Sequence, residues 1–309
     1  MPIELILGDF DILRCLDIIY IIFSYSMNKT LIGKEDYLFL INDSCNELGT
    51  QCSEVIPNIK IPNHLDFNNY ILIVFPNKSL ILNQYLPERY QGKHRHAVNI
   101  YKRHLKEKIL DGYEYLKDEN DVYYKTDAHI NLKGGYIVYK KFIEKVNELF
   151  NWNLEVEIIN IEVKSCILKD LCRGIGDLTW ETNLGNQVLN DITDNYYYSN
   201  DMLDFYIYYT IKNENSIKFL DYELNDNTLL LENQNTNWDI ISKYIIYKKN
   251  EQCKHRVLIF YDSFLLNTLP LYLKLFGEVY LVKSIYRNDL IKLINPEYVF
   301  EFRVERFLF

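Results

Sequence analysis

Two short motifs combine residue types that can carry out acyl transfer, and the first of them centres on a serine. In the stretch VLIFYDSFLL, the apolar run from Val257 to Phe260 leads directly into Asp262 and Ser263, and a helical pattern follows. A serine at such a strand-to-helix turn has its hydroxyl at the carboxyl edge of the sheet, beside backbone N–H groups that can hold an oxyanion. Taken alone, the motif fits a serine that only caps a helix better than it fits a nucleophile.

The second motif, YYKTDAHINLKGG, places Asp127 and His129 on one loop with a single alanine between them. At this spacing the carboxylate can fix the imidazole tautomer and leave the other ring nitrogen to take a proton from a serine. An incidental surface loop is one alternative. A pair of metal ligands is another, but we expect no metal because no third and fourth ligand stand at a suggestive spacing.

The two motifs together indicate an active site more strongly than either does alone. Both follow predicted strands whose carboxyl ends should meet at one edge of the same sheet. Triads are assembled in space and occur in several chain orders, so the long separation between the motifs is no objection. The residues therefore predict Ser263 as nucleophile, His129 as general base and Asp127 as the group that orients it.

Strand and helix patterns alternate in both end regions, which predicts an α/β fold with a parallel sheet covered by helices. We expect strands at residues 70–75, in DVYYKTDAH, and at 257–260, 278–283 and near the C-terminus. A charged helix is expected over 89–111, and another begins at Asn131 as N-cap, with Gly134 and Gly135 tolerated at a close packing contact. The pattern degrades between about 151 and 255, so we expect a single domain over 1–309 with a mixed insertion or lid there.

Composition excludes several classes of protein. A chain of 309 residues with 48% hydrophobic content can build a proper core, and a net charge of −9 argues against nucleic-acid binding. Six scattered cysteines without a CxxC pair predict buried free thiols and no zinc site. The apolar stretch 12–25 contains Arg14 and Asp17 and is too short to span a bilayer, which predicts a buried or amphipathic helix in a cytoplasmic protein. A peripheral contact of this helix with a membrane surface is the alternative.

Several further segments resemble one known family, the SGNH-hydrolase-like proteins of the alginate O-acetyltransferase (AlgX/AlgJ) type. The similar segments are GKEDYLFL, FPNK, YYKTDAHINLKGG, GDL (residues 176–178), DSF (262–264) and PEYVFEFRVERFL. The resemblance implies a flavodoxin-like three-layer α/β sandwich with a permuted motif order, and it assigns the same triad of Ser263, His129 and Asp127. The chain differs from the family pattern at Tyr261, where the family has glycine. It also differs at Ile130 and Asn131, where the family has Trp-Thr.

By that resemblance the expected activity is transfer of acetyl groups onto a polysaccharide or glycan precursor through an acyl-enzyme. We expect no bound cofactor, acetyl-CoA as a candidate donor, and a carbohydrate acceptor, with association with a membrane surface or a biosynthetic complex left open. A carbohydrate acetylesterase and a noncatalytic glycan-binding protein are the alternatives. Four further residues are candidates for substrate contact or for the oxyanion hole: Tyr261, Asn267, Asp177 and Arg306. Arg303 and Arg306 equally fit ion pairs that tie the last strand to the sheet.

Overall fold

The computed structural model describes residues 29–59, 61, 68–167, 177–179, 193–199, 217–223, 228–232, 245–250 and 253–308. The predicted helix over 12–25 lies outside these ranges. Within them, no helix is both long enough and apolar enough to cross a membrane.

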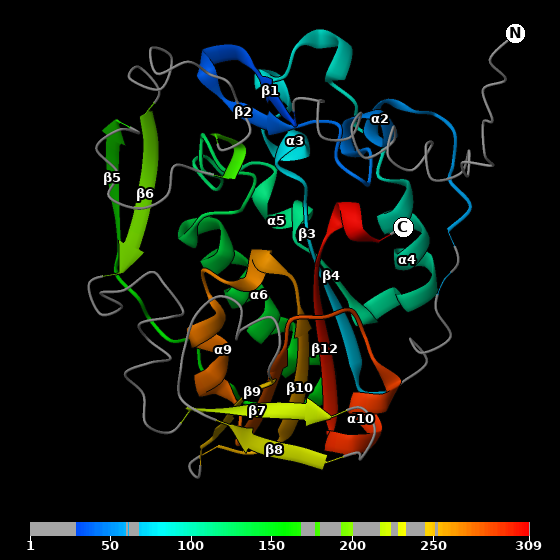
Figure 1. Cartoon of the computed structure of the whole chain (residues 1–309), viewed down its shortest axis with the longest axis vertical. Coiled ribbons are helices and arrows are strands. Elements are labelled where there is room, and N and C mark those ends of the chain that lie inside the picture. Colours follow the sequence, from blue (N-terminus) through cyan, green and yellow to red (C-terminus); the bar gives the residue numbers. More distant parts are fainter. Residues whose placement is uncertain are drawn as a thin grey trace, which may run out of the picture.

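The molecule is built on an eight-stranded sheet with the order β4-β3-β12-β10-β11-β9-β7-β8 (Figure 1). Neighbours among the first five strands pair in parallel, and β9, β7 and β8 add antiparallel pairs at one edge. The strands are β3 Tyr70–Phe75, β4 Ile109–Asp111, β7 Ile217–Glu223, β8 Thr228–Glu232, β9 Ile245–Lys249, β10 Arg256–Tyr261, β11 Glu278–Val282 and β12 Tyr298–Val304. Small antiparallel sheets are formed by β1 Thr30–Ile32 with β2 Leu38–Leu40, and by β5 Ile161–Ile167 with β6 Thr193–Ser199.

Helices cover both faces of the central strands. The longer helices are α4 His96–Leu105, α6 Leu132–Phe150, α9 Leu269–Leu275 and α10 Asn288–Ile294, and the short ones are α2 Glu47–Cys52, α3 Lys78–Ile81 and α5 Tyr113–Leu116. One buried cluster joins α6 and α9 to the alternate residues Ile71, Ile73 and Phe75 of β3, and the other joins α4 and α10 to Tyr70, Leu72 and Val74. Because alternate residues of a strand face opposite sides, both faces are apolar and the predicted three-layer α/β sandwich is confirmed.

The described strands of the region from 151 to 255 belong to two different sheets. Strands β7, β8 and β9 continue the main sheet beyond β11, whereas β5 and β6 pair only with each other. Strands therefore make up part of this region, and its role as an insertion or lid stays a prediction.

Two predictions from the sequence are corrected here. The helix expected over 89–111 spans only His96–Leu105, and its last residues form β4 at the sheet edge. The helix ends because the backbone changes direction at Lys106, which has a φ of 54°. The thiols are less buried than expected: Cys52 is exposed, and Cys45 and Cys253 are half-buried, all three being free. The other cysteine side chains lie outside the described part.

Arg95, in the charged stretch just before α4, is held in a nearly buried network of ion pairs. Arg95 donates to Asp111 at 2.8 Å and to Glu305 at 2.7 Å, and its side chain is 10% exposed. The pairing explains why the guanidinium can be buried.

Asn131 and the paired glycines behave as predicted at the start of α6. The Asn131 side chain accepts a hydrogen bond from the Gly134 N–H at 3.0 Å. A Cβ added to Gly134 would lie 2.6 Å from the Val122 carbonyl oxygen and from a side-chain carbon of Ile130. The helix therefore needs its glycine because the loop that carries His129 packs against it.

We expect Gly134→Ala to destabilise the protein by about 1–3 kcal/mol, although alanine is the better helix former by about 1 kcal/mol. The contact with backbone cannot be relieved by rotating a side chain. Urea unfolding should show a lower midpoint with an unchanged m-value. The exposed Glu148 on the same helix supplies the control, since Glu148→Ala should change the free energy of unfolding by less than about 0.5 kcal/mol. Equal midpoints for the two variants would contradict this account.

Candidate active site

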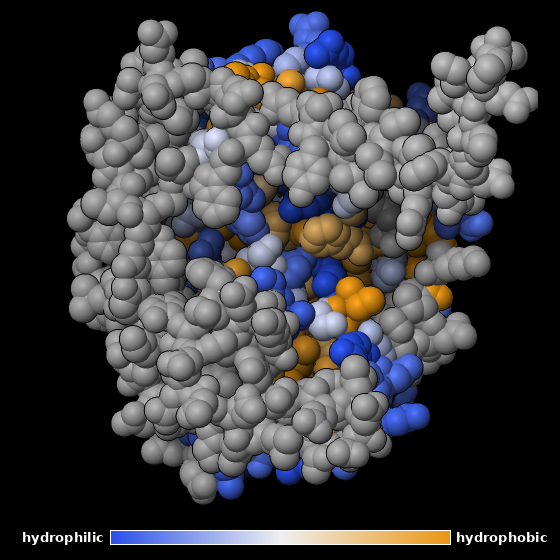
Figure 2. All heavy atoms as spheres, viewed as in Figure 1, coloured by the Kyte–Doolittle hydropathy of each residue, from blue (hydrophilic) through white to orange (hydrophobic). Residues whose placement is uncertain are grey.

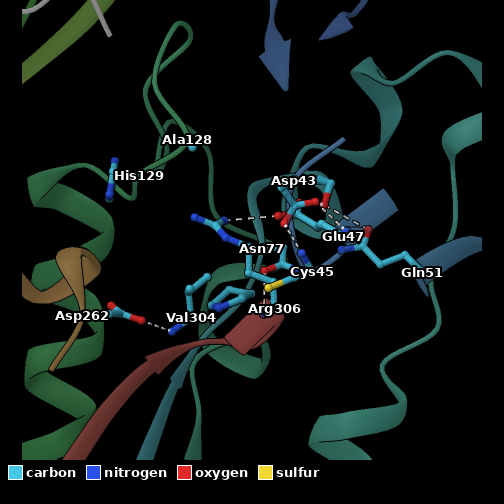
Figure 3. A network of polar contacts seen from close by, with 12 residues as sticks. Asp43, Cys45, Glu47, Gln51, Asn77, Ala128, His129, Asp262, Val304 and Arg306 are labelled. Atoms are coloured by element: carbon cyan, nitrogen blue, oxygen red, sulfur yellow. Dashed lines mark hydrogen bonds and ion pairs between the residues drawn. The ribbon is translucent and has the colours of Figure 1, made fainter. Parts of the chain in front are cut away.

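Ser263 is held at the carboxyl end of β10 by the aspartate before it. Asp262 is buried, and its carboxylate accepts hydrogen bonds from the Phe264 N–H at 2.9 Å and the Val304 N–H at 2.6 Å. The first bond caps the 3₁₀ turn Ser263–Leu265, and the second joins the end of β10 to the end of β12 (Figure 3). Asp262 thus fixes the backbone on which Ser263 stands.

The Asp-x-His loop reaches the same edge of the sheet, but not as the end of a strand. The strand predicted in DVYYKTDAH is reduced to one isolated antiparallel bridge between Tyr123 and Ile130. The loop is held instead by hydrogen bonds to its carbonyl groups. The Lys78 ammonium donates to the carbonyls of Lys125 at 2.8 Å and Asp127 at 3.0 Å.

Asn267 supplies a further anchor for this loop. Its side-chain N–H donates to the Ile130 carbonyl at 2.7 Å. Lys78 was not among the predicted site residues; its only signal in the sequence is its place directly after the strand 70–75, in FPNK.

The side chains of the two motifs meet in a hydrogen-bonded line. His129 Nε2 lies 2.7 Å from Ser263 Oγ, and His129 Nδ1 lies 2.6 Å from Asp127 Oδ1. The His129 and Asp127 side chains are each 24% exposed, so the line opens to solvent on one side. The structure therefore brings together all three residues predicted for the triad.

The charges of the site support a histidine poised as a base. Burial lowers the pKa of His129, but the adjacent Asp127 carboxylate raises it by more, so the pKa lies above its usual 6.5. Burial raises the pKa of Asp127, but the charge and hydrogen bonds of His129 outweigh this and hold that pKa below its usual range. Asp127 is consequently ionised at neutral pH and can stabilise the imidazolium that forms when His129 takes a proton.

With this geometry in view, the chain can be compared with known proteins. No family model and no curated protein sequence matches it. Among solved structures, Bacillus cereus PatB1 aligns with a TM-score of 0.57 and 15% identity over 90% of this chain and 96% of that one. The O-acetyltransferase domain of Pseudomonas putida AlgJ aligns with a TM-score of 0.51 and 15% identity over 90% and 91%. A DHHW family protein from Eubacterium siraeum aligns with a TM-score of 0.54 and 16% identity over 91% of this chain and 92% of that one.

The chain has the fold of PatB1 and of the AlgJ O-acetyltransferase domain. The resemblance to the AlgX/AlgJ type is thereby confirmed for the fold, and the identities are too low to extend it further. This AlgJ-like fold explains why a strand, a loop and a C-terminal turn far apart in sequence meet at one edge of the sheet.

Described residues of mixed character lie at that edge of the AlgJ-like fold. Figure 2 shows hydrophilic and hydrophobic residues side by side over the upper ends of β10 and β12. A mixed surface of this kind suits a ligand with both hydroxyl groups and apolar ring faces.

Arg306 lies at the same edge, in the 3₁₀ turn Glu305–Phe307 that follows β12. Its guanidinium donates to Glu47 at 3.2 Å (Figure 3). It also lies over the Phe264 ring at 5.3 Å, and that ring is 4.9 Å from the His129 ring. Arg306 therefore forms an ion pair, but its partner lies in α2 and not in the sheet. Arg303 pairs at 2.8 Å with Glu301 of its own strand, so the expected ties from the last strand to the sheet are corrected.

Two of the remaining candidates do not point toward a substrate. Tyr261 is fully buried in the core, because its side chain faces the α6 and α9 layer. Asn267 donates one of its two amide N–H groups to the loop backbone. The structure therefore gives Tyr261 a packing role in place of substrate contact, and it shows Asn267 as an anchor of the loop.

Asp177 is the candidate that the structure brings closest to the triad. Its Oδ2 lies 3.4 Å from His129 Nδ1. A carboxylate oxygen of Asp127, a ring nitrogen of His129 and a carboxylate oxygen of Asp177 all lie within 4.8 Å of one another. The sequence showed no third acidic group near the Asp-x-His pair, and the structure supplies one. Both nitrogens of His129 are already hydrogen-bonded, to Asp127 and Ser263, which is the arrangement of a proton relay.

We expect the reaction of Ser263 with an activated ester to increase with pH through one ionisation above 6.5. Only neutral His129 can accept the serine proton, and Asp127 keeps the imidazolium stable to higher pH than usual. Pre-steady-state acylation rates between pH 5 and 9 measure the midpoint. A rate that stays constant across this range would contradict the assignment of His129 as base.

Proposed function

We propose that the protein is a serine-dependent O-acyltransferase that acetylates a polysaccharide or a glycan precursor. The observation that carries the proposal is the hydrogen-bonded line from Asp127 through His129 to Ser263 at the carboxyl edge of the sheet. A fold shared with the AlgJ O-acetyltransferase domain is consistent with it.

In the first half of the proposed cycle, His129 Nε2 takes the Ser263 proton as Oγ attacks the carbonyl carbon of the acyl donor. The developing oxyanion needs a donor beside Ser263. The Phe264 N–H is occupied by Asp262, and the Leu265 N–H by the Asp262 carbonyl. The Ser263 N–H has no partner among the described residues, so we assign it to the oxyanion. Collapse then expels the leaving group, which takes the proton from His129.

In the second half, a hydroxyl of the acceptor gives its proton to His129 and attacks the acyl carbon. Breakdown of the tetrahedral intermediate returns the proton to Ser263 and releases the acetylated acceptor. Water entering in place of the acceptor would give hydrolysis, so transfer depends on the site holding a sugar hydroxyl while excluding water.

A transfer assay tests this function against its alternatives. The protein would be incubated with acetyl-CoA or p-nitrophenyl acetate and neutral or uronic-acid oligosaccharides, and the sugars analysed by mass spectrometry. An oligosaccharide heavier by one acetyl group is the expected result. Release of acetate with no sugar product would identify an esterase. Neither product, together with saturable binding of an oligosaccharide, would overturn the enzymatic proposal in favour of a glycan-binding protein.

A further inference from the structure

Asp177 contacts the catalytic loop from a segment that is distant in the sequence. Its carboxylate Oδ1 accepts the Ala128 N–H at 2.7 Å, and its own N–H donates to Asp127 Oδ2 at 3.2 Å. The two residues that precede His129 in the motif, Asp127 and Ala128, are thus both bonded to one residue outside it. These bonds fix the loop backbone and the Asp127 carboxylate at the same time.

The residues after Asp177 are docked on the N-terminal part of the fold. The Leu178 carbonyl accepts a hydrogen bond from the Thr30 hydroxyl at 2.6 Å, and the Leu178 side chain is buried with Leu38 and Ala128. The 3₁₀ turn Asp177–Thr179 therefore lies between β2 and the Asp-x-His loop. This docking gives Asp177 a defined place, although both segments that flank the turn lie outside the described ranges.

The second carboxylate also changes the electrostatics of the imidazole. Asp177 Oδ2 is 3.4 Å from His129 Nδ1, and a negative charge at this distance favours the imidazolium. The other charged groups that act on His129 are Asp127, which also favours the imidazolium, and Arg306, which opposes it. Burial and the neighbouring Asp127 raise the pKa of Asp177 to about 6, so this carboxylate is charged over the range in which His129 should act as a base.

We propose that Asp177 is a positioning residue of the active site, which locks the Asp-x-His loop through two backbone bonds and holds the imidazolium of His129 as its second carboxylate partner. The catalytic part of this inference rests on the proposed acyl transfer. The electrostatic part does not, since it concerns only His129 in the free protein.

The test separates charge from hydrogen bonding with two substitutions. Asp177→Asn keeps an oxygen for the Ala128 N–H but removes the charge, whereas Asp177→Ala removes both. Titration of the His129 ring by heteronuclear NMR should show the pKa lowered by about one unit in either variant. The acid limb of the acylation rate should move to lower pH by the same amount. The plateau rate should fall less than about tenfold for Asp177→Asn and more for Asp177→Ala, because one lost kcal/mol is about a fivefold change.

Glu148→Gln is the matched control for loss of one negative charge. It lies near the far end of α6, about 25 Å along the helix from Asn131, and should leave the His129 titration unchanged. An unchanged pKa of His129 in Asp177→Asn would overturn the inference, whether or not the wild type transfers acetyl groups. An absence of acylation in the wild type would instead count against the proposed function, and the NMR titration would still decide the role of Asp177.

Discussion

Replacement of Ser263 by alanine is expected to abolish formation of the acyl-enzyme and to lower kcat by a factor of about 10⁴ to 10⁶. The Oγ atom is the only group that we assign to attack the donor, and His129 Nε2 lies 2.7 Å from it, ready to take its proton. Intact-mass spectrometry after incubation with an activated acetyl ester provides the measurement. The wild type should gain the mass of one acetyl group, and the variant should gain none.

Ser284 offers a matched control at the same edge of the sheet. It follows β11, and its backbone carbonyl, not its hydroxyl, accepts the bond from Arg303. Ser284→Ala should therefore acylate like the wild type. A sulfonyl fluoride gives an independent check, since it reacts with a serine that an adjacent base activates. An equal acetyl adduct on Ser263→Ala would show that another residue is the nucleophile, and the proposed mechanism would have to be abandoned.

The parts of the fold that follow from local pattern were predictable from the sequence. The run Tyr70 to Phe75 is continuously apolar, and it forms a strand buried on both faces within the stated bounds. Asn131 has a side chain suited to an N-cap, and it caps α6. The order Asp262-Ser263 after an apolar run placed the serine at a strand end, because the residues that form this turn are adjacent in the sequence.

Features that depend on distant contacts were not predictable in the same way. The three residues of β4 lie at the end of a charged stretch, and only pairing with β3 makes them a strand. Lys78 and Asp177 act on the Asp-x-His loop through backbone groups of that loop, which no spacing in the sequence reveals. Tyr261 was misassigned because it is close to Ser263 in the sequence, whereas its side chain belongs to the last residue of β10 and is buried against the helices of the α6 and α9 layer.

Asp262→Asn is expected to lower the free energy of unfolding by about 2–3 kcal/mol, since the cost of an unmatched buried polar group is of this order. The carboxylate accepts two N–H donors, from Phe264 and Val304, and only an ionised carboxyl has an acceptor oxygen for each. An asparagine can satisfy one of them and must direct its own N–H group at the other. Because the residue is only 7% exposed, water cannot take over the lost bond.

Urea unfolding measures this effect, with the exposed Asp118 as control. Asp118→Asn removes the same charge without touching a buried bond, so its midpoint should match that of the wild type. The substitution at 262 should also slow acylation of Ser263, because the bond to the Phe264 N–H caps the turn that carries the nucleophile. Unfolding midpoints that agree for the two variants would mean that the ends of β10 and β12 do not depend on Asp262. The placement of Ser263 would then have to come from the packing of Phe264 and Leu265 alone, which are both buried.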